Sequence, residues 1–249
     1  MYQGLKDKII ILTGAGGLIG REVLKHLIGC GAKVVAVDIA EFDNEATLFL
    51  TKNITLTEDI DSVIETTMRE FGRIDGLVNL AYPRTSDWGN KFEDVTYSSW
   101  QKNVDMQLSA VFYICQKTLE IMKTQKSGSI VNVGSIYGVV GNDFSLYEDY
   151  GGTSAAAYSA IKGGLINFTR YLASYYGKYN IRVNCVSPGG VLDESKQHPS
   201  FIKKYNDRSP LKRLGNAPEM APPISFLLSD DASFITGHNL MVDGGWTSI

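Results

Sequence analysis

The first 38 residues contain the pattern that most constrains the fold. Residues 8–12 are a short apolar run of the kind found in a buried parallel strand. A glycine-containing turn follows at 13–20, then a helical pattern at 21–28 and a second apolar run at 33–37, which ends on Asp38. This order of strand, glycine turn, helix, strand and acid is typical of a dinucleotide-binding βαβ unit.

Each part of this unit suits a different part of a dinucleotide. Glycines let the backbone approach the pyrophosphate, and the amino terminus of the following helix supplies N–H groups and a positive dipole. The acid at the end of the second strand accepts hydrogen bonds from the adenosine ribose hydroxyls. We therefore expect the cofactor to contact Gly14, Gly17, Leu18, Ile19, Gly20 and Asp38.

The charge at the same place predicts which cofactor binds. Asp38 repels the 2′-phosphate of NADP, and the residue after it is Ile39 rather than an arginine. Neither Ala15 nor Gly16 supplies a compensating cation. The sequence therefore predicts NAD(H) rather than NADP(H).

The rest of the chain alternates between strand and helix patterns without a linker or a repeat. Apolar runs predict further strands at 47–50, 74–79, 129–133, 182–186 and 238–242. Helical periodicity predicts helices at 57–71 (capped by Thr57), 98–125, 155–176, 200–206 and 218–228. Segment 41–46 is too short for a crossover helix. Residues 1–249 are therefore predicted to be a single NAD(P)-binding Rossmann-type domain of the α/β class, a doubly wound parallel sheet of about seven strands flanked by helices.

Composition excludes several classes of function. The 24 basic and 27 acidic residues nearly cancel, so nothing favours nucleic acid or a membrane surface as a partner. Three scattered cysteines and three scattered histidines predict a reducing compartment and no metal site. No apolar run approaches the roughly 18 residues of a spanning helix, and the first residues contain no secretory segment. We expect a cytoplasmic protein that acts on a small molecule.

A tyrosine and a lysine one helical turn apart form the candidate catalytic pair. Within the helix predicted at 155–176, Tyr158 and Lys162 lie at positions i and i+4 on one face. A neighbouring ammonium favours the phenolate, so Lys162 is expected to lower the Tyr158 pKa from its usual value of about 10. The same spacing occurs at Tyr2/Lys6, Tyr113/Lys117 and Tyr158/Lys162. Only the third pair follows a serine at a strand end, Ser135, where ligands of open α/β sheets bind.

With these features in place, the chain resembles the compact branch of the short-chain dehydrogenase/reductase family over essentially its full length. The residues that carry the resemblance are the turn at 13–20, Asp38, Asn79-Leu80-Ala81, Ser135, Tyr158 with Lys162, Asn184, Pro188-Gly189 and the ending at 235–245. The resemblance implies that Ser135 and Tyr158 hold the reacting oxygen and that Tyr158 exchanges the proton. It also implies that Lys162 binds the nicotinamide ribose.

The resemblance adds further site residues, some with departures from the family pattern. Gln107 aligns with the family's helix asparagine and is expected to join the catalytic set. Further cofactor contacts are implied at Asn53, Ile54, Asn79, Ala81, Lys162, Pro188, Gly189 and Val191. Asn53 replaces an aspartate at the adenine edge, and its side-chain carbonyl can still accept a hydrogen bond. Leu18 replaces the middle glycine of the turn, and Asp193 replaces a threonine that contacts the pyrophosphate.

Three segments suggest where a substrate lies. An insertion at about 139–154 separates Ser135 from Tyr158, and it is either a tolerated surface loop or a substrate wall, with Tyr147 and Tyr150 as candidate substrate residues. Arg84 is either a solvated loop charge or an anchor for a substrate carboxylate or phosphate. The region at about 190–217 is expected to cover the substrate.

These features predict an NAD(H)-dependent oxidoreductase that interconverts a secondary alcohol and a ketone. A sugar-derived polar carbonyl suits the acidic, aromatic insertion, and the chain resembles bacterial enzymes of surface-glycan biosynthesis and flagellin modification. A 3-oxoacyl-carrier-protein reductase is the alternative within enzymes, although it would need a basic docking surface. A non-catalytic dinucleotide-binding scaffold is the alternative outside enzymes, although it would be expected to lack Ser135, Tyr158 or Lys162.

The two long predicted helices bear on assembly. Segments 98–125 and 155–176 carry apolar residues on more than one face: Val111, Phe112, Leu165, Phe168 and Leu172. In the family the equivalent helices pair across two-fold axes. The resemblance therefore implies a homodimer or a homotetramer.

Overall fold

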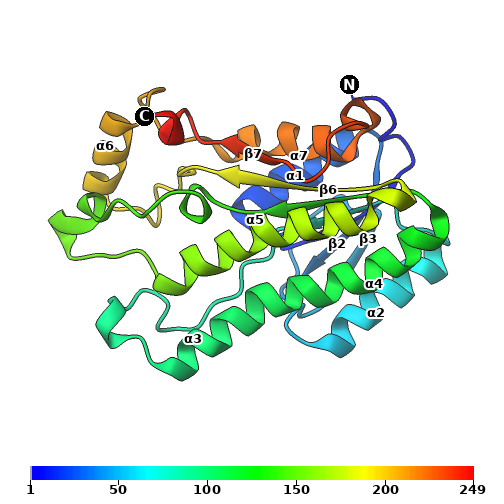
Figure 1. Cartoon of the computed structure of the whole chain (residues 1–249), viewed down its shortest axis with the longest axis horizontal. Helices are drawn as coiled ribbons and strands as arrows, with labels where there is room; N and C mark the ends of the chain where they lie inside the picture. The colour runs from blue at the N-terminus through cyan, green and yellow to red at the C-terminus, as the bar shows by residue number, and fades with distance from the viewer. Residues whose placement is uncertain (1) are drawn as a thin grey trace.

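A computed structural model describes residues 2–249 and contains one parallel sheet of seven strands (Figure 1). The strands are β1 (Ile9–Thr13), β2 (Lys33–Asp38), β3 (Leu48–Thr51), β4 (Gly76–Asn79), β5 (Gly128–Val133), β6 (Ile181–Pro188) and β7 (Asn239–Val242). Their order across the sheet is β3-β2-β1-β4-β5-β6-β7. This order is that of a doubly wound sheet, so the predicted fold class is confirmed.

Helices cover both faces of the sheet. They are α1 (Leu18–Gly29), α2 (Thr57–Phe71), α3 (Tyr97–Val104), α4 (Ala110–Gln125), α5 (Ala156–Tyr176), α6 (Pro199–Arg208) and α7 (Ala221–Leu228). In Figure 1, α1 and α7 lie on one side of the sheet, and α2, α4 and α5 lie on the other. No helix within residues 2–249 is both long and apolar enough to cross a membrane.

Two apolar cores follow from the alternation of side chains along the strands. In β1, Ile9 and Ile11 point into the core shared with α2, α4 and α5. Ile10 and Leu12 point into the core shared with α1 and α7. Because both faces are covered, β1 is apolar at every position except its last, as expected for a parallel strand.

The winding direction reverses between β1 and β4, which are neighbours in the sheet. Thr13 and Asn79, the last residues of these strands, lie side by side. Thr13 Oγ1 accepts from the backbone N–H of Leu80 at 3.1 Å and so ties the two strand ends together. Ligands of such sheets bind at the carboxyl edge next to this reversal, which places the site.

Some predicted boundaries and roles differ in the structure. Segment 41–46 has no helix, as expected, but Thr57 does not cap α2, because Leu56 occupies the cap position and its side chain accepts no hydrogen bond. The helix predicted at 98–125 is continuous through α3 and α4, with a π-helical segment at Asp105–Ser109 between them. A π segment adds one residue to a single helical turn and leaves the apolar residues on either side in place. An amphipathic pattern therefore does not reveal it.

The apolar residues invoked for assembly divide into two groups. Val111, Leu165 and Leu172 are buried in this chain's own core, so they are wrong as candidates for a free helix face. Phe112 is 48% exposed, and its ring lies 6.1 Å from that of Phe168 on α5. Only the second group is available for contact with another chain.

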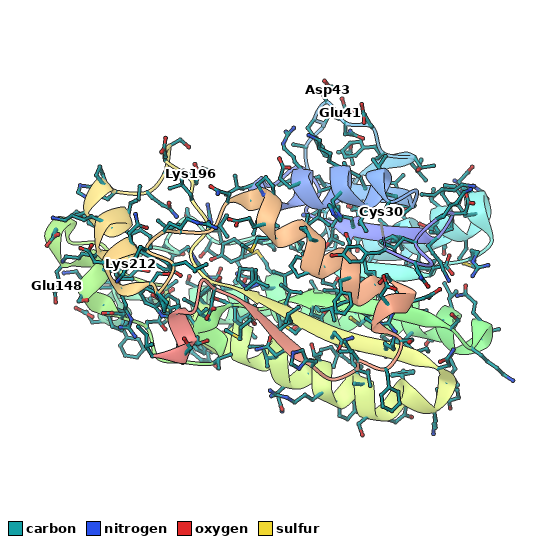
Figure 2. The ribbon with its side chains drawn as sticks, turned by 90° about the horizontal axis from the view of Figure 1, so that it is seen from above. Cys30, Glu41, Asp43, Glu148, Lys196 and Lys212 are labelled. Atoms are coloured by element: carbon teal, nitrogen blue, oxygen red, sulfur yellow. The ribbon has the colours of Figure 1, made fainter. Side chains whose placement is uncertain are left out.

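The insertion at 139–154 packs against α6. Its short helix, Phe144–Tyr150, lies next to α6, and Lys204 donates to Asp149 at 2.8 Å while Arg208 pairs with Asp143. Figure 2 shows Glu148, from this short helix, at the α6 end of the molecule. In the same view Glu41 and Asp43 lie on a loop that projects beside α1. The insertion and this loop therefore flank opposite ends of the carboxyl edge.

Candidate active site

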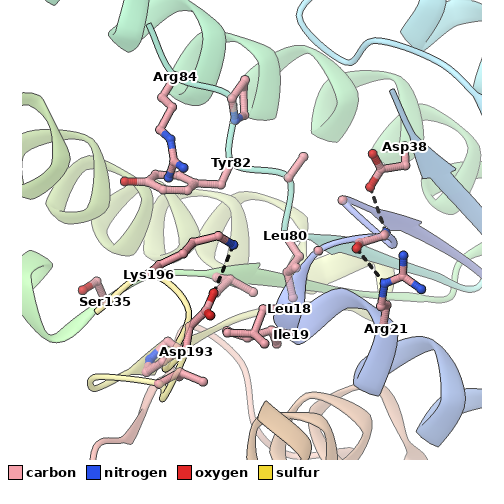
Figure 3. Close-up of a pocket in the computed structure, with 18 of the residues that line it drawn as sticks. Leu18, Ile19, Arg21, Asp38, Leu80, Tyr82, Arg84, Ser135, Asp193 and Lys196 are labelled. Carbon is pink, nitrogen blue, oxygen red and sulfur yellow. Dashed lines mark hydrogen bonds and ion pairs between the residues drawn. The ribbon is translucent and has the colours of Figure 1, made fainter. Parts of the chain in front are cut away.

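A cleft of about 890 Å³ runs along the carboxyl edge of the sheet. It begins at the glycine turn and the end of β2, passes the ends of β4 and β5, and ends below the segment that leads into α6. Figure 3 shows Asp38 and Arg21 toward one side of this cleft, and Ser135, Tyr82 and Arg84 toward the other. The cleft therefore contains both the predicted cofactor residues of the glycine turn and the predicted catalytic residues.

The glycine turn is too close to its neighbours to hold side chains. Gly14 has φ +69°, and a Cβ there would lie 2.6 Å from Ala81 Cα. A Cβ at Gly20 would lie 2.0 Å from the Gly14 carbonyl oxygen. The backbone therefore forms a bare cradle at the amino terminus of α1, which fits a pyrophosphate. Gly20 itself does not line the cleft, and the turn requires a residue without a side chain there.

Asp38 is held in place by backbone donors. Its Oδ2 accepts from the Gly16 N–H and its Oδ1 from the Ile39 N–H, both at 2.8 Å. A carboxylate that lines the cleft in this position can also accept from ribose hydroxyls. The structure thus puts the predicted acid beside the predicted turn.

Arg21 and Phe42 are cleft residues that sequence reasoning missed. Arg21 Nε donates to the Gly16 carbonyl at 3.0 Å, and its guanidinium lies 4.5 Å from the centre of the Phe42 ring. Phe42 belongs to the connection without a helix, and both side chains line the cleft. The only sequence signal was an aromatic residue inside a polar loop.

Two asparagines predicted to contact the cofactor, Asn53 and Asn79, form side-chain hydrogen bonds with other residues of the protein. The Asn53 side-chain oxygen accepts from the Thr55 N–H at 3.1 Å and from Thr55 Oγ1 at 2.9 Å. The expectation that this oxygen is free to accept from an adenine is therefore not met, although Asn53 and Ile54 both line the cleft. Asn79 is buried, donates to Asn132 at 2.9 Å and lies outside the cleft lining. Ala81, after it, lines the cleft as predicted.

The catalytic candidates Ser135, Tyr158 and Lys162 meet in the middle of the cleft. Ser135 follows β5, and its Oγ accepts from the Tyr137 N–H at 3.2 Å. Tyr158 and Lys162 are one turn apart on α5, and Lys162 Nζ lies 5.7 Å from the centre of the Tyr158 ring. Lys162 Nζ donates to the Val133 carbonyl at 2.7 Å. The end of β5 and one face of α5 thus bring together three residues that span 27 positions of the sequence.

Burial controls the charge of the catalytic pair. It raises the pKa of the Tyr158 phenol, and a hydrogen bond with the Ser135 side chain opposes this shift. Burial also lowers the pKa of the Lys162 ammonium to about 8. The net shift of the Tyr158 pKa in this structure is upward rather than downward as expected, because burial outweighs the interactions that favour the phenolate.

An aromatic cluster surrounds Tyr158, and its other members were missed as site residues. The rings of Tyr82 and Tyr158 meet edge to face at 5.7 Å, and Trp88 meets Tyr82 at 5.7 Å and Tyr158 at 6.2 Å. Both come from the irregular loop after β4. Edge-to-face contacts of this kind fix the orientation of each ring. The loop therefore positions the Tyr158 ring.

Gln107 does not line the cleft. It is buried on the π-helical segment, and its Nε2 has no hydrogen-bond partner among the described residues. A buried amide donor without a partner is uncommon and costs free energy. The role that the resemblance implies at this position belongs mainly to the main-chain carbonyl, which would hold a water, so a catalytic role of Gln107 stays a prediction.

The far end of the cleft is formed by the segment after β6. Pro188, Gly189 and Val191 line the cleft as predicted. Asp193 also lines it, but Lys196 Nζ lies 3.0 Å from its Oδ2 and Ser195 donates to its Oδ1 at 2.6 Å. The carboxylate of Asp193 is thus neutralised within its own loop.

Tyr147 and Tyr150 do not line the cleft that contains Tyr158. They line a second cavity of about 520 Å³, between the insertion and α6, where the Tyr150 ring stacks on His198 at 4.5 Å. Lys196, Gln197 and Phe201 line both cavities and separate them. Tyr147 packs on the same apolar cluster as Tyr158, and its ring lies 5.5 Å from that of Phe201, which lines the cleft. A substrate role for Tyr147 and Tyr150 therefore stays a prediction.

Comparison with known proteins relates the chain to a large group of enzymes. Residues 14–247 match a family model described as enoyl-(acyl carrier protein) reductase. The chain is 32% identical to a post-translational flagellin modification protein A of Campylobacter coli, over 97% of this chain and 99% of that protein. It is 34% identical to a 7alpha-hydroxysteroid dehydrogenase of Bacteroides fragilis, over 97% and 95% of the two chains.

A solved structure shows the same arrangement. The chain superposes on a short chain dehydrogenase of Leptospira borgpetersenii with bound NAD+, with a TM-score of 0.89 and 32% identity. The match covers 97% of this chain and 93% of that one. The fold and the length are thus shared along the whole chain.

Proposed function

Because the chain belongs to the short-chain dehydrogenase/reductase family, it is an oxidoreductase, and we propose that it interconverts a secondary alcohol and a ketone with NAD(H). The observation that carries this proposal is the meeting of Ser135, Tyr158 and Lys162 in one cleft. The other end of that cleft is the bare glycine turn with Asp38. A hydride carrier and a proton donor can therefore reach the same reacting carbon and oxygen.

The residues of the cleft fit a dinucleotide. The turn at Gly14 and Gly17 and the start of α1, Leu18 and Ile19, face the pyrophosphate, and Asp38 receives the adenosine ribose. Lys162 would hold the nicotinamide ribose, with Pro188, Gly189 and Val191 against the carboxamide end. The bound nicotinamide supplies or accepts the hydride.

Asp38 supports NAD(H) rather than NADP(H). Both of its oxygens are fixed by backbone N–H groups, so the carboxylate cannot swing away from a 2′-phosphate. Arg21 lies nearby, but its Nε is bonded to the Gly16 carbonyl and its plane packs on Phe42. The Leptospira relative was solved with NAD+ in its site, which supports the same choice.

The proton chemistry follows from the two pKa values. The Tyr158 phenol, with its pKa raised by burial, is protonated at neutral pH and can donate to the carbonyl oxygen during reduction. Ser135 lies beside it and holds the same oxygen. The Lys162 ammonium, with a pKa of about 8, is still mostly charged at neutral pH. Its charge stabilises the phenolate that remains after the proton has left.

For the substrate we propose a sugar-derived polar carbonyl, with the insertion at 139–154 and the region at 190–217 around it. The similarity to a flagellin modification protein and the polar residues of the cleft support this. A 3-oxoacyl-carrier-protein reductase is the competing function, favoured by 33% identity to a 3-oxoacyl-[acyl-carrier-protein] reductase of Salmonella typhimurium over 98% of both chains. We place the enzyme in the cytoplasm, in surface-glycan biosynthesis, with neither nucleic acid nor membrane as a partner.

The direct test is a panel of carbonyl substrates. Oxidation of NADH and of NADPH would be followed with neutral and charged keto-sugars, cyclic ketones and an acetoacetyl thioester. The proposal predicts turnover of polar cyclic ketones with NADH and little with NADPH. Turnover of the thioester alone would support the carrier-protein reductase instead, and no turnover of any ketone would contradict both.

A further inference from the structure

Arg84 places a positive charge in the half of the cleft that would hold the substrate. It follows β4 in the loop that carries Tyr82 and lines the cleft. Figure 3 shows its guanidinium over the Tyr82 ring, and the two groups lie 5.3 Å apart. The Tyr82 ring in turn packs edge to face on Tyr158, so the Tyr82 ring contacts both the guanidinium and the candidate catalytic phenol.

No acidic side chain neutralises this charge. Within residues 2–249, no carboxylate lies within 4.0 Å of the Arg84 guanidinium. Asp87, the acid nearest to Arg84 in the sequence, accepts from Ser99 Oγ at 2.8 Å instead. Arg84 is exposed and lines the cleft, so its unpaired charge faces the space that a substrate would enter.

The other charges of the cleft leave the substrate half positive. Its acidic residues Asp38 and Glu41 belong to the adenosine end, beside the glycine turn. At the substrate end Asp193 is neutralised by Lys196 at 3.0 Å. Arg84 and Lys162 then remain without an acidic partner among the described residues, so this half of the cleft attracts an anion.

We propose that Arg84 binds a carboxylate or phosphate group of the substrate, about one ring away from the reacting carbonyl. A planar guanidinium donates two parallel hydrogen bonds to either group, which suits a fixed arginine better than a flexible lysine. The inference rests on the proposed function and narrows it to anionic ketones and alcohols. Tyr82 acts as the platform that keeps the guanidinium in place.

The test measures binding to the complex of the enzyme with NADH, so it does not depend on turnover. Calorimetry would compare 3-oxocyclohexanecarboxylate with its uncharged methyl ester. A charge-assisted pair predicts that the acid binds at least about tenfold more tightly than the ester to the native enzyme. Arg84→Gln should remove this preference and leave binding of the ester within about twofold, because the ester makes no ion pair.

Two further variants and one further ligand pair complete the experiment. Lys91→Gln removes an exposed charge from the same loop and should keep the preference, and Arg84→Lys should keep part of it. Dihydroxyacetone phosphate and dihydroxyacetone repeat the comparison for phosphate, so the tighter of the two anions identifies the group. Equal binding of charged and neutral ligands, including no binding of any of them, would overturn the inference, as would a preference that survives Arg84→Gln.

Failure of this inference and failure of the proposed function can be told apart. Binding of NADH and reduction of the neutral ester use Asp38, Tyr158 and Lys162 and do not involve Arg84. If the native enzyme reduces the ester but shows no preference for the acid, the role of Arg84 is wrong and the reaction class stands. If it prefers the acid but reduces neither, Arg84 binds anions and the reaction class is wrong.

Discussion

Tyr158 and Lys162 lie among apolar side chains at the carboxyl edge of the sheet, and burial disfavours the charged form of both. The Tyr158 pKa is raised and the Lys162 pKa is lowered to about 8. A phenol that stays protonated suits reduction of a carbonyl. A lysine that can lose its proton near pH 8 makes the stability of the protein depend on pH.

That dependence gives a prediction for Lys162. Between pH 8 and its usual pKa of 10.5, the folded protein binds fewer protons at Lys162 than the unfolded chain does. The free energy of unfolding therefore contains a contribution from Lys162 that rises with pH across this window. The difference between native protein and Lys162→Met should grow in favour of the native protein by about 3 kcal/mol from pH 8 to 10.5. Urea unfolding at several pH values measures it, and a difference that stays flat would contradict the lowered pKa.

Asp38 carries the second prediction at this scale. Asp38→Ala combined with Ile39→Arg should shift the ratio of kcat/KM between NADH and NADPH toward NADPH by about ten- to a hundredfold, because a repulsive charge is replaced by an attractive one. Asp38→Asn is the matched variant, since its side-chain oxygen can still accept from the Gly16 N–H while the charge is lost. Native turnover that is equal or better with NADPH would contradict the assignment of Asp38.

Single site residues were predictable where a local pattern identified them. Ser135, Tyr158 and Asp38 follow from a strand end, a helical spacing and a βαβ unit, all within short segments. The pairs Arg21–Phe42 and Tyr82–Tyr158 could not be predicted, because each joins segments whose separation in space depends on the folded loops. The sign of the Tyr158 pKa shift was missed for a similar reason, since burial is a property of the surroundings.

At the scale of elements, the insertion and α6 pack on each other beside Tyr158. Leu146, in the short helix of the insertion, is buried against a cluster that includes Tyr205 of α6 and Trp246. The ion pairs of Lys204 with Asp149 and of Arg208 with Asp143 join the same two elements at the surface. The insertion therefore holds in place the segment that borders the cleft through Lys196, Gln197 and Phe201.

Weakening this contact should change substrate binding and spare the cofactor. The double variant Asp143→Asn and Asp149→Asn keeps the size of both side chains and removes both ion pairs. Each exposed pair contributes about 0.2–1 kcal/mol, so KM for the substrate should rise about two- to tenfold while the Kd for NADH stays unchanged. Steady-state kinetics and NADH fluorescence titration measure the two quantities.

A control separates this effect from a general loss of charge. Glu70→Gln breaks the exposed pair of Glu70 with Arg69 on α2, far along the chain from the insertion, and should leave KM unchanged. Melting curves of all variants show whether folding is affected. An unchanged KM in the double variant would mean that the insertion does not position the substrate end.

Elements themselves were largely predictable, and their ends were not. The strands of the sheet are short apolar runs, so their existence follows from sequence, while β4 begins at Gly76 rather than at the predicted residue 74. The Asp75 backbone just before it bonds to Ile9 and Ser129, and the Asp75 carboxylate accepts from the Ile9 N–H at 2.9 Å. A hydrogen bond between residues so far apart in the sequence has no local sequence signal.

At the scale of the whole molecule, one face of α5 remains uncovered within this chain. Phe168, Tyr171 and Tyr175 lie in a row along it, with Phe168 and Tyr171 stacked at 6.4 Å and Tyr171 and Tyr175 at 6.1 Å. Tyr171 is 60% exposed, and Phe112 of α4 extends the row. A row of exposed aromatic rings on one face favours contact with another chain.

We therefore predict a homodimer or a homotetramer in which this face is covered. Light scattering at micromolar concentration should give a mass of two or four chains, and Tyr171→Asp should lower it toward one chain by placing a charge in the contact. Phe234→Asp puts the same charge on an exposed aromatic residue outside this row and, as the matched control, should leave the mass unchanged. A monomeric native protein would contradict the prediction.

The most direct test of the central claim is the pair of variants Tyr158→Phe and Tyr113→Phe, assayed for NADH-dependent reduction of the ketone turned over best in the substrate panel. Both tyrosines precede a lysine by four residues, but Tyr113 donates to Asp61 at 3.0 Å outside the cleft. Tyr158→Phe should lower kcat by about a hundred- to ten-thousandfold with little change in NADH affinity, and Tyr113→Phe should keep native kcat. Native-like turnover by Tyr158→Phe would contradict Tyr158 as the proton donor.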